Sequence, residues 1–476
     1  MFNQTVSPER KSESPSIGGE DGQRVCVIGA GSSGISSCQV LGSRGIPYDC
    51  FEKGSEIGGN WRYLNDNGMS AAYRSLHINT SRDLMAYASF PMPKDYPDYP
   101  SHEQIADYFD SFVDHFGIRE HIRFRTEVTS VQPEGEGYQV SWRSREGEEG
   151  SRWYSAVMVA NGHHWDPRWP EPAFPGSDSF TGEQMHAHDY KEPNSLAGKR
   201  VLVLGIGNSA TDIAVESSRN ADQTYLAMRR GAYIIPKYLR GVPIDKAGSP
   251  QLLSRLPLRI QRFFYALSLK SSQGDMTDYG LPKPDHRILE AHPTVSSELL
   301  SRLGHGAITV KPNIAEFAGG RTICFDDGSE EEVDVVIYCT GYKVTFPFFS
   351  EDFFSAPDNQ LELYRRVVSP EHPGLYFVGF IQPLGAVMPI AERQSEWIAD
   401  LIEGDCALPE PAKMREEIRR EQARMQKRYV SSKRHTIQVD FWPYLRSIDK
   451  ERSKHRHRNG KSQRSSSDRH QAVASQ

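Results

Sequence analysis

The stretch RVCVIGAGSSGISSCQVLGSRG, residues 24–45, decides the fold class of this chain. A short run of β-branched residues leads into three glycines spaced as GxGxxG, and a helix rich in small residues follows. In such a motif the first glycine, Gly29, permits the tight turn, Gly31 lets a pyrophosphate approach the backbone, and Gly34 lets the helix pack closely on the strand. The stretch therefore predicts a strand, a loop and a helix that bind a dinucleotide.

The residues that follow strengthen this interpretation. The next expected strand, YDCFE, ends at Glu52, where a carboxylate accepts hydrogen bonds from a ribose diol. The glycine motif alone is weak evidence, because an ordinary α/β sheet also contains glycine turns. The chain then reads GGNW, in which adjacent glycines allow the backbone close to a cofactor, and we expect Gly59, Asn60 and Trp61 to contact it.

The same pattern occurs a second time in KRVLVLGIGNSATDIAVESS, residues 199–218, with Ala210 in the place of the third glycine. The strand after it, TYLAM, has no acidic end and runs into two arginines. Arginines in the place of the ribose carboxylate suit a 2′-phosphate, so we expect NADPH rather than NADH, with a solvated arginine pair as the alternative. The residues expected to bind this second nucleotide are Gly205, Gly207, Asn208, Ser209, Arg229 and Arg230.

Composition excludes several other functions. The chain has 476 residues, is 37% hydrophobic and carries a formal charge of −6, so we expect a globular enzyme with small-molecule partners rather than a nucleic-acid or membrane partner. Its six cysteines form no CxxC pair and no metal-like spacing, which argues for a reducing, cytoplasmic location and against a metal site or a disulfide reductase. No apolar run approaches the roughly 20 residues of a membrane span, and the first residues do not resemble a signal peptide.

A further motif, FTGEQMHAHDYK, precedes the second glycine loop, and its Phe180, Gly182, His186 and Tyr190 match FxGxxxHxxxY. Together with GAGSSG, GGNW, NTSRDLM, GIGNSA and CTGY, it resembles the flavin-containing monooxygenase family over about residues 23–450. The related Baeyer–Villiger monooxygenases are similar but carry tryptophan where this sequence has Tyr190, which places them second.

The resemblance implies an α/β fold of two Rossmann-like domains, with the NADPH-binding domain inserted into a discontinuous FAD-binding domain. We expect the FAD domain at residues 23–170 and 331–450 and the NADPH domain at 171–330, between disordered tails at 1–22 and 451–476. The implied activity is insertion of one oxygen atom of O2 into a soft nucleophile, a small N- or S-containing molecule, through a C4a-hydroperoxyflavin. A Baeyer–Villiger reaction on a ketone is the alternative.

The resemblance also implies roles for individual residues. Asn79 would be a turn or cap residue on local grounds, but it matches the family's active-site asparagine. His186 is expected to be a hinge and cofactor-positioning residue rather than an acid–base catalyst, and Gln382 is expected to contact the flavin. The basic, polar C-terminal segment makes the soluble, microbial type the better comparison, and the oligomeric state stays open, a homodimer being one option.

Overall fold

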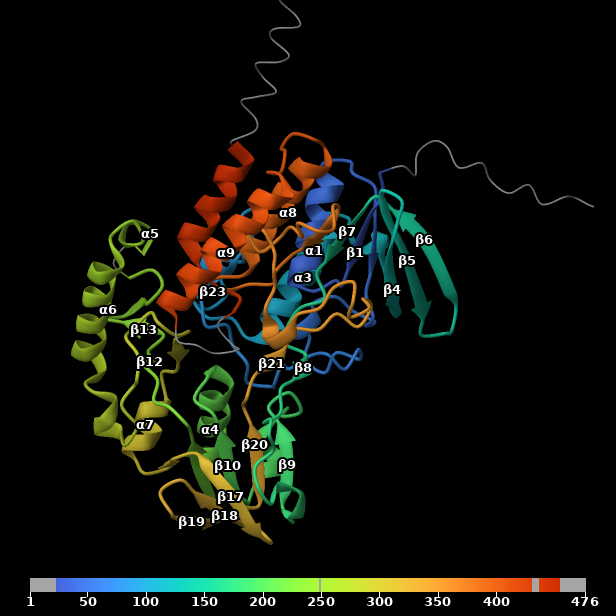
Figure 1. The fold of residues 1–476 in the computed structure, drawn as a ribbon. Coiled ribbons are helices and arrows are strands. Elements are labelled where there is room, and N and C mark those ends of the chain that lie inside the picture. The colour runs from blue at the N-terminus through green and yellow to red at the C-terminus, as the bar shows by residue number, and fades with distance from the viewer. Residues whose placement is uncertain (1–22, 248–249, 430–435, 454–476) are drawn as a thin grey trace, which may run out of the picture.

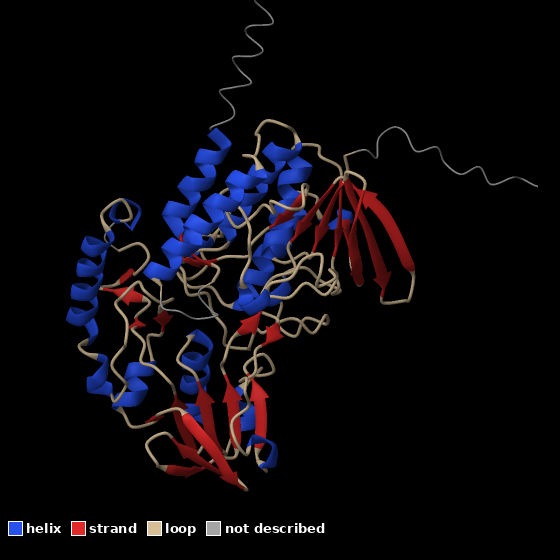
Figure 2. Cartoon of the chain, in the orientation of Figure 1, coloured by secondary structure: helices blue, strands red, loops and turns tan. Residues whose placement is uncertain are grey.

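The computed structural model describes residues 23–247, 250–429 and 436–453, and Figure 1 shows their arrangement. The N-terminal segment at 1–22 and most of the C-terminal segment, both expected to be disordered, lie outside the described residues. Two parallel sheets with their helices form two neighbouring bodies (Figures 1 and 2). The predicted α/β fold with two Rossmann-like units is therefore confirmed.

The first sheet contains the strand of the first glycine motif at its centre. Its order is β22-β7-β1-β2-β3, and every neighbouring pair is parallel. Three of its strands are buried at every residue, as expected for a parallel sheet covered on both faces. The strands are β1 (Val25–Ile28), β2 (Tyr48–Phe51), β3 (Ile122–Arg123), β7 (Ala156–Val159) and β22 (Leu375–Phe377), and the helices nearby include α1 (Ser32–Ser43), α3 (His102–His115) and α8 (Met388–Ile402).

The second sheet repeats this plan around the second glycine motif. Its order is β16-β11-β10-β20-β9, again with parallel neighbours, and helix α4 (Asn208–Asn220) follows the central strand. The strands are β9 (Glu183–His186), β10 (Arg200–Leu204), β11 (Gln223–Ala227), β16 (Thr309–Lys311) and β20 (Val335–Tyr338). Two copies of one motif thus build two sheets of the same kind.

One domain boundary expected from the sequence is displaced. We placed the return to the first domain at residue 331, but β20 pairs in parallel with β10, with Val335 opposite Val201. The chain leaves the second sheet only after β20, at the CTGY segment, where β21 (Tyr342–Lys343) pairs with β8 (Asp166–Pro167). The second unit therefore extends to about residue 339, because its sheet needs β20 between β10 and β9.

The two units also contain smaller sheets and additional helices. Antiparallel sheets are formed by β4 (Thr126–Glu134), β5 (Gly137–Ser144) and β6 (Glu149–Tyr154), and by β17 (Ile314–Gly319), β18 (Thr322–Phe325) and β19 (Glu330–Glu332). A charged helix, α9, spans Pro411–Arg428. Helices α5 (Pro250–Leu253) and α6 (Leu258–Gln273) lie at the edge of the molecule (Figure 1). None of the described helices is both long and apolar enough to cross a bilayer.

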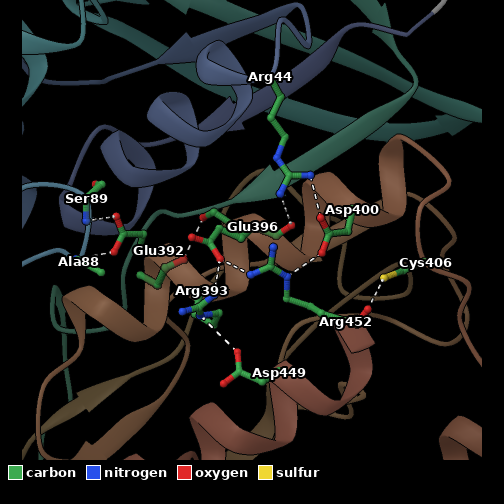
Figure 3. Close-up of polar contacts among 12 residues, drawn as sticks. Arg44, Ala88, Ser89, Glu392, Arg393, Glu396, Asp400, Cys406, Asp449 and Arg452 are labelled. Carbon is green, nitrogen blue, oxygen red and sulfur yellow. Dashed lines mark hydrogen bonds and ion pairs between the residues drawn. The ribbon is translucent and has the colours of Figure 1, made fainter. Parts of the chain in front are cut away.

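The C-terminal helical residues 441–453 are fixed by an ionic network shown in Figure 3. Asp400, fully buried in α8, accepts from Arg44 of α1 at 2.7 Å and from Arg452 at 2.6 Å. Glu451 is 2% exposed and pairs with Arg365 at 2.9 Å. The start of the expected disordered tail at residue 451 was therefore wrong, since residues 451–453 continue a helix with buried ionic contacts.

Candidate active site

A cavity of about 780 Å³ lies where the carboxyl ends of the first sheet's strands face the second unit. In open parallel sheets this edge is where ligands bind. Segments far apart in the sequence meet there, and their members include Gly31, Glu52, Trp61, Asn79, His163, Asn208, Asp245, Tyr265, His292 and Gln382. The site therefore exists only when both units are packed together.

The first glycine loop forms one wall of this cavity and has no room for side chains. Gly29 has φ of +97°, and a Cβ there would lie 2.8 Å from the carbonyl oxygen of Ala160. A Cβ at Gly34 would lie 1.8 Å from the carbonyl oxygen of Gly29, so the helix packs directly on the turn. The predicted reasons for the glycines at these two positions are therefore found in the structure.

The GGNW segment lies against the same loop. A Cβ on Gly59, whose φ is +53°, would lie 3.1 Å from Gly31 Cα. Asn60 and Trp61 are both half-buried and line the cavity. The Asn60 amide oxygen, however, accepts from the backbone N–H of Ala71 at 2.8 Å, so this side chain also orders its own loop.

Glu52 stands at the end of β2 as predicted, and it is 4% exposed at the cavity wall. Its Oε2 accepts from the backbone N–H of Ala30 at 2.8 Å, and its Oε1 accepts from Gly54 N–H at 2.7 Å and from Asn67 Nδ2 at 3.1 Å. These donors fix the carboxylate beside the first glycine loop. A fixed acceptor at this place fits a ribose diol.

Asn79 and Gln382 come to the cavity from segments of the first unit that are far apart in the sequence. Asn79 is half-buried at the wall, and no hydrogen bond joins its side chain to any residue that the structure describes. Gln382 begins β23 (Gln382–Leu384), which pairs with β24 (Gln438–Asp440), and its backbone N–H donates to Ile437 O at 2.8 Å. The structure thus brings both predicted residues to the same cavity as the glycine loop and Glu52.

The second glycine loop contributes less to the cavity wall than the first. Gly205 has φ of +134°, and a Cβ there would lie 2.8 Å from the carbonyl oxygen of Cys339. Of the residues expected to bind the second nucleotide, Asn208 lines the cavity, whereas Gly205, Gly207, Ser209, Arg229 and Arg230 do not.

The two arginines lie just beyond the carboxyl end of β11, next to the second glycine loop, and both are exposed. Arg230 Nε lies 3.5 Å from Asp285 Oδ2. The pair occupies the expected place for binding a 2′-phosphate, and the preference for NADPH at this site stays a prediction.

None of the four linker-motif residues lines the cavity. His186 is fully buried, and burial lowers its pKa to about 4. Its Nδ1 accepts from His188 N–H at 3.0 Å, as a neutral imidazole does. Tyr190 donates to Glu216 of α4 at 2.7 Å, Phe180 packs on Phe317, and a Cβ on Gly182 would meet the Phe180 ring at 2.5 Å. These residues make packing and hydrogen-bond contacts, and the hinge and cofactor-positioning role of His186 stays a prediction.

The residues that the second unit places in the cavity were not predicted from the sequence. They come from the long connection between β11 and β16, and include Ile244, Asp245, Gln261, Tyr265, Leu289 and His292. His163, from the loop after β7, was also missed, and burial lowers its pKa well below the usual range. No local motif marks these residues, because only tertiary packing brings them to the site.

No group of three His, Cys, Asp or Glu residues within the described ranges is arranged to hold a metal ion. The cavity combines the first glycine loop, the fixed carboxylate of Glu52 and the amide of Asn79, which has no hydrogen-bond partner in the described part of the chain. Such a set suits a flavin dinucleotide. The residues present therefore fit FAD.

Comparison with known proteins agrees with this fit. The model of the family described as "Flavin-binding monooxygenase-like" matches residues 22–454. Flavin-containing monooxygenase 5 of Rattus norvegicus is 39% identical over 439 residues, which are 90% of this chain and 82% of that protein. Flavin-containing monooxygenase 3 of Homo sapiens is 34% identical over 438 residues, 89% of this chain and 81% of that protein. These relatives are mammalian, so they do not support the preference for a microbial type as the better comparison.

Solved structures show the same fold. S-allyl-L-cysteine S-oxygenase from Allium sativum superposes with a TM-score of 0.68 at 26% identity, covering 90% of this chain and 88% of that one. The open structure of cyclohexanone monooxygenase gives 0.66 at 18% identity, covering 90% and 97%. The chain therefore belongs to the flavin-binding monooxygenase-like family, whose members are NADPH-dependent flavoprotein monooxygenases that use FAD.

Proposed function

We propose that this protein transfers one oxygen atom of O2 to a soft nucleophile, which is a nitrogen or sulfur centre of a small molecule. NADPH is the reductant. The observation that carries the proposal is Asn79, whose amide has no hydrogen-bond partner among the described residues and lies in the same cavity as the first glycine loop, Glu52 and Gln382. The S-oxygenase from Allium sativum, with the same fold, supports a sulfur substrate.

The first unit would hold FAD. Helix α1 has no side-chain cap and no acidic residue in its first turn, so its N-terminal N–H groups are free to receive a pyrophosphate at Gly31. Glu52 would accept from the ribose hydroxyls. When bound, the flavin supplies the reaction with O2, and the protein supplies orientation and exclusion of water.

The second unit would present NADPH to the flavin. Asn208, at the start of α4, is the residue that joins the second glycine loop to the cavity wall. Arg229 and Arg230 would bind the 2′-phosphate at the far end of the nucleotide. Asn79 would donate and accept hydrogen bonds beside the reacting groups, where a largely apolar wall that includes Phe348, Phe441 and Trp442 makes such bonds stronger.

This function needs no acid–base dyad and no metal in the protein, because the bound cofactors carry the reactivity. The neutral His186 outside the cavity and the lowered pKa of the half-buried His163 are consistent with it. A Baeyer–Villiger reaction on a ketone remains the alternative, since cyclohexanone monooxygenase shares the fold. At 18% identity that likeness concerns the fold alone, and Tyr190 is the sequence feature that favours oxygenation of nitrogen or sulfur.

The test is a measurement on the purified protein of its visible flavin spectrum, NADPH oxidation, hydrogen peroxide and oxygenated product. Trimethylamine, a dialkyl sulfide and a cyclic ketone are compared as substrates. An N-oxide or sulfoxide formed in step with NADPH supports the proposal, and a lactone from the ketone alone supports the alternative. A colourless protein without NADPH oxidation refutes both.

We also propose that the partners are limited to the small-molecule substrate and O2, and that the enzyme works in the cytoplasm. Its six free cysteines suit a reducing compartment. Localisation of a tagged chain tests the compartment, and light scattering on the purified protein tests the homodimer considered in the sequence analysis.

A further inference from the structure

A hairpin of the second unit forms hydrogen bonds and an ion pair with the loop that carries Asn79. The hairpin, residues 237–246, contains β13 (Tyr238–Leu239) and β14 (Val242–Pro243) and belongs to the connection between β11 and β16. It contacts the Asn79 loop, residues 78–83, at three points. These are Lys237 Nζ to Ile78 O at 3.3 Å, Ser81 N–H to Asp245 Oδ2 at 2.6 Å, and Lys246 Nζ to Asp83 Oδ2 at 2.6 Å.

The hairpin also contacts Asp98 and Tyr99 of the first unit. The Tyr99 hydroxyl donates to Lys237 O, and the Tyr238 hydroxyl donates to Asp98 Oδ2 at 3.0 Å. Lys237 Nζ lies 5.0 Å from the centre of the Tyr99 ring. The hairpin is thus bound to the first unit by several independent contacts, and its position relative to the Asn79 loop is well defined.

We call the three contacts between the hairpin and the Asn79 loop the clamp. Asp245 makes the central one. Its Oδ2 receives a short, charge-assisted hydrogen bond from a residue that is fully buried and two positions from Asn79. Its Oδ1 is buried and has no hydrogen-bond partner among the described residues, although Asp245 itself lines the cavity. The Asp245 side chain is thus held through Oδ2, which accepts from Ser81 N–H.

The hairpin is connected in turn to the second glycine loop. Asn208 Oδ1 accepts from Val295 N–H at 2.8 Å, and Thr294 Oγ1 donates to Ile206 O at 2.7 Å. Both contacts involve β15 (Thr294–Val295), which pairs with β12 (Ile234–Ile235), the strand just before the hairpin. An unbroken series of backbone and side-chain contacts therefore runs from the second glycine loop to the Asn79 loop.

We propose that Asp245 is a positioning residue that fixes the Asn79 loop through Ser81 N–H, and so ties the geometry of the oxygenation site to the second unit. The inference rests on the proposed function for its catalytic consequence, but not for the contact itself. Loss of the contact frees the loop and lets Asn79 move from the reacting groups. Uncoupled turnover, in which NADPH oxidation yields hydrogen peroxide in place of product, is the consequence.

The first test is hydrogen–deuterium exchange of the peptide covering residues 76–85, which needs no activity. Asp245→Ala removes the acceptor, and Asp245→Asn keeps an oxygen that can accept from Ser81. Asp327→Ala is the matched control, because Asp327 also accepts a backbone N–H, at 3.0 Å from Ser329, but in an exposed turn away from the cavity. We expect exchange in this peptide to be roughly tenfold faster in D245A and unchanged in D245N and D327A.

The second test is the ratio of peroxide to NADPH consumed, measured with the preferred substrate on flavin-loaded enzyme. D245A should raise this ratio several-fold, D245N should stay near wild type, and D245A combined with Asn79→Ala should be no worse than N79A alone. A positioning role predicts this non-additivity, whereas a general loss of stability adds to the effect of N79A. If D245A does not fold, Lys246→Ala, which removes the outer contact, should give a smaller change in the same direction.

The outcomes separate the two proposals. If hydrogen–deuterium exchange of the 76–85 peptide is unchanged in D245A, the role of the clamp in fixing the loop is overturned, whatever the activity of the enzyme. Faster exchange with an unchanged peroxide ratio overturns the positioning role, as does an additive double variant. A wild-type enzyme that forms no oxygenated product overturns the proposed function, and the exchange measurement still decides the clamp.

Discussion

Gly31 and Gly34 lie three residues apart in the first glycine loop, but the structure gives them different tasks. A Cβ on Gly31 would lie 3.7 Å from Gly59 Cα, an ordinary contact, and its φ of −75° suits alanine. A Cβ on Gly34 would lie 1.8 Å from the carbonyl oxygen of Gly29, a backbone atom that cannot turn aside. We therefore expect Gly31→Ala to fold and bind FAD weakly, and Gly34→Ala to fold poorly.

The magnitudes follow from these distances. Overfilling a packed site costs about 1–3 kcal/mol, and an overlap with backbone belongs at the upper end, so Gly34→Ala should lower the free energy of unfolding of the apoprotein by about 3 kcal/mol. Gly31→Ala replaces an N-cap glycine and should cost less than about 1 kcal/mol of stability. Its methyl group would stand where we expect the pyrophosphate to approach, so FAD should bind about 5- to 150-fold more weakly.

Denaturant unfolding of the flavin-free protein measures the first quantity, and titration of the same protein with FAD measures the second. Gly304→Ala is the control, because Gly304 ends α7 (Leu299–Gly304) and no atom lies within 4 Å of its added Cβ. It should change neither quantity. The reasoning is refuted if Gly31→Ala binds FAD as tightly as wild type, or if flavin-free Gly34→Ala is as stable as Gly304→Ala.

Three further predictions use the same protein. Glu52→Gln should weaken FAD binding by about 1–3 kcal/mol, since an amide keeps only one of two acceptor oxygens, and full affinity in the titration would contradict the ribose role. Arg229→Ala with Arg230→Ala should lower the ratio of kcat/KM for NADPH to that for NADH about tenfold or more, and an unchanged ratio would show a merely solvated pair. His186 has its pKa lowered by burial from 6.5 to about 4, so the stability it contributes is present above pH 6.5 and is lost as the pH falls toward 4. His186→Gln should flatten the dependence of Tm on pH in this window, and an equally steep curve would contradict a neutral buried imidazole.

Much of the fold was predictable because its decisive signals are local. The signals are the glycine spacing, the strand before it and the acid that follows the next strand, and they lie close together in the sequence. The structure places Gly29, Gly34 and Glu52 accordingly. The boundary at residue 331 was wrong because β20 is apolar like the strands of either sheet, and only pairing with β10 assigns it. Local pattern does not specify which of two sheets a buried strand joins.

The cavity-lining residues of the first unit were largely predictable from the sequence, whereas most of those of the second unit were not. Asn79 and Gln382 reach the cavity as expected, and Asn60 is both at its wall and bonded to Ala71. Asp245, Tyr265 and His292 carry no motif, because their segment is a long connection whose position depends on packing against the first unit. Sequence reasoning that follows strands and glycine loops cannot place such a segment.

The linker motif contacts helix α4, and so does a tyrosine of the first unit. Tyr190 donates to Glu216, and Tyr73 of the first unit donates to Asp212, one helical turn earlier on the same helix. Burial raises the pKa of Asp212 to about 6. Because α4 begins at the second glycine loop, we expect these two hydrogen bonds to hold the helix, and with it the loop, relative to the first unit. Tyr190 of the linker motif and Tyr73 of the first unit thus contact the same helix, although neither residue lines the cavity.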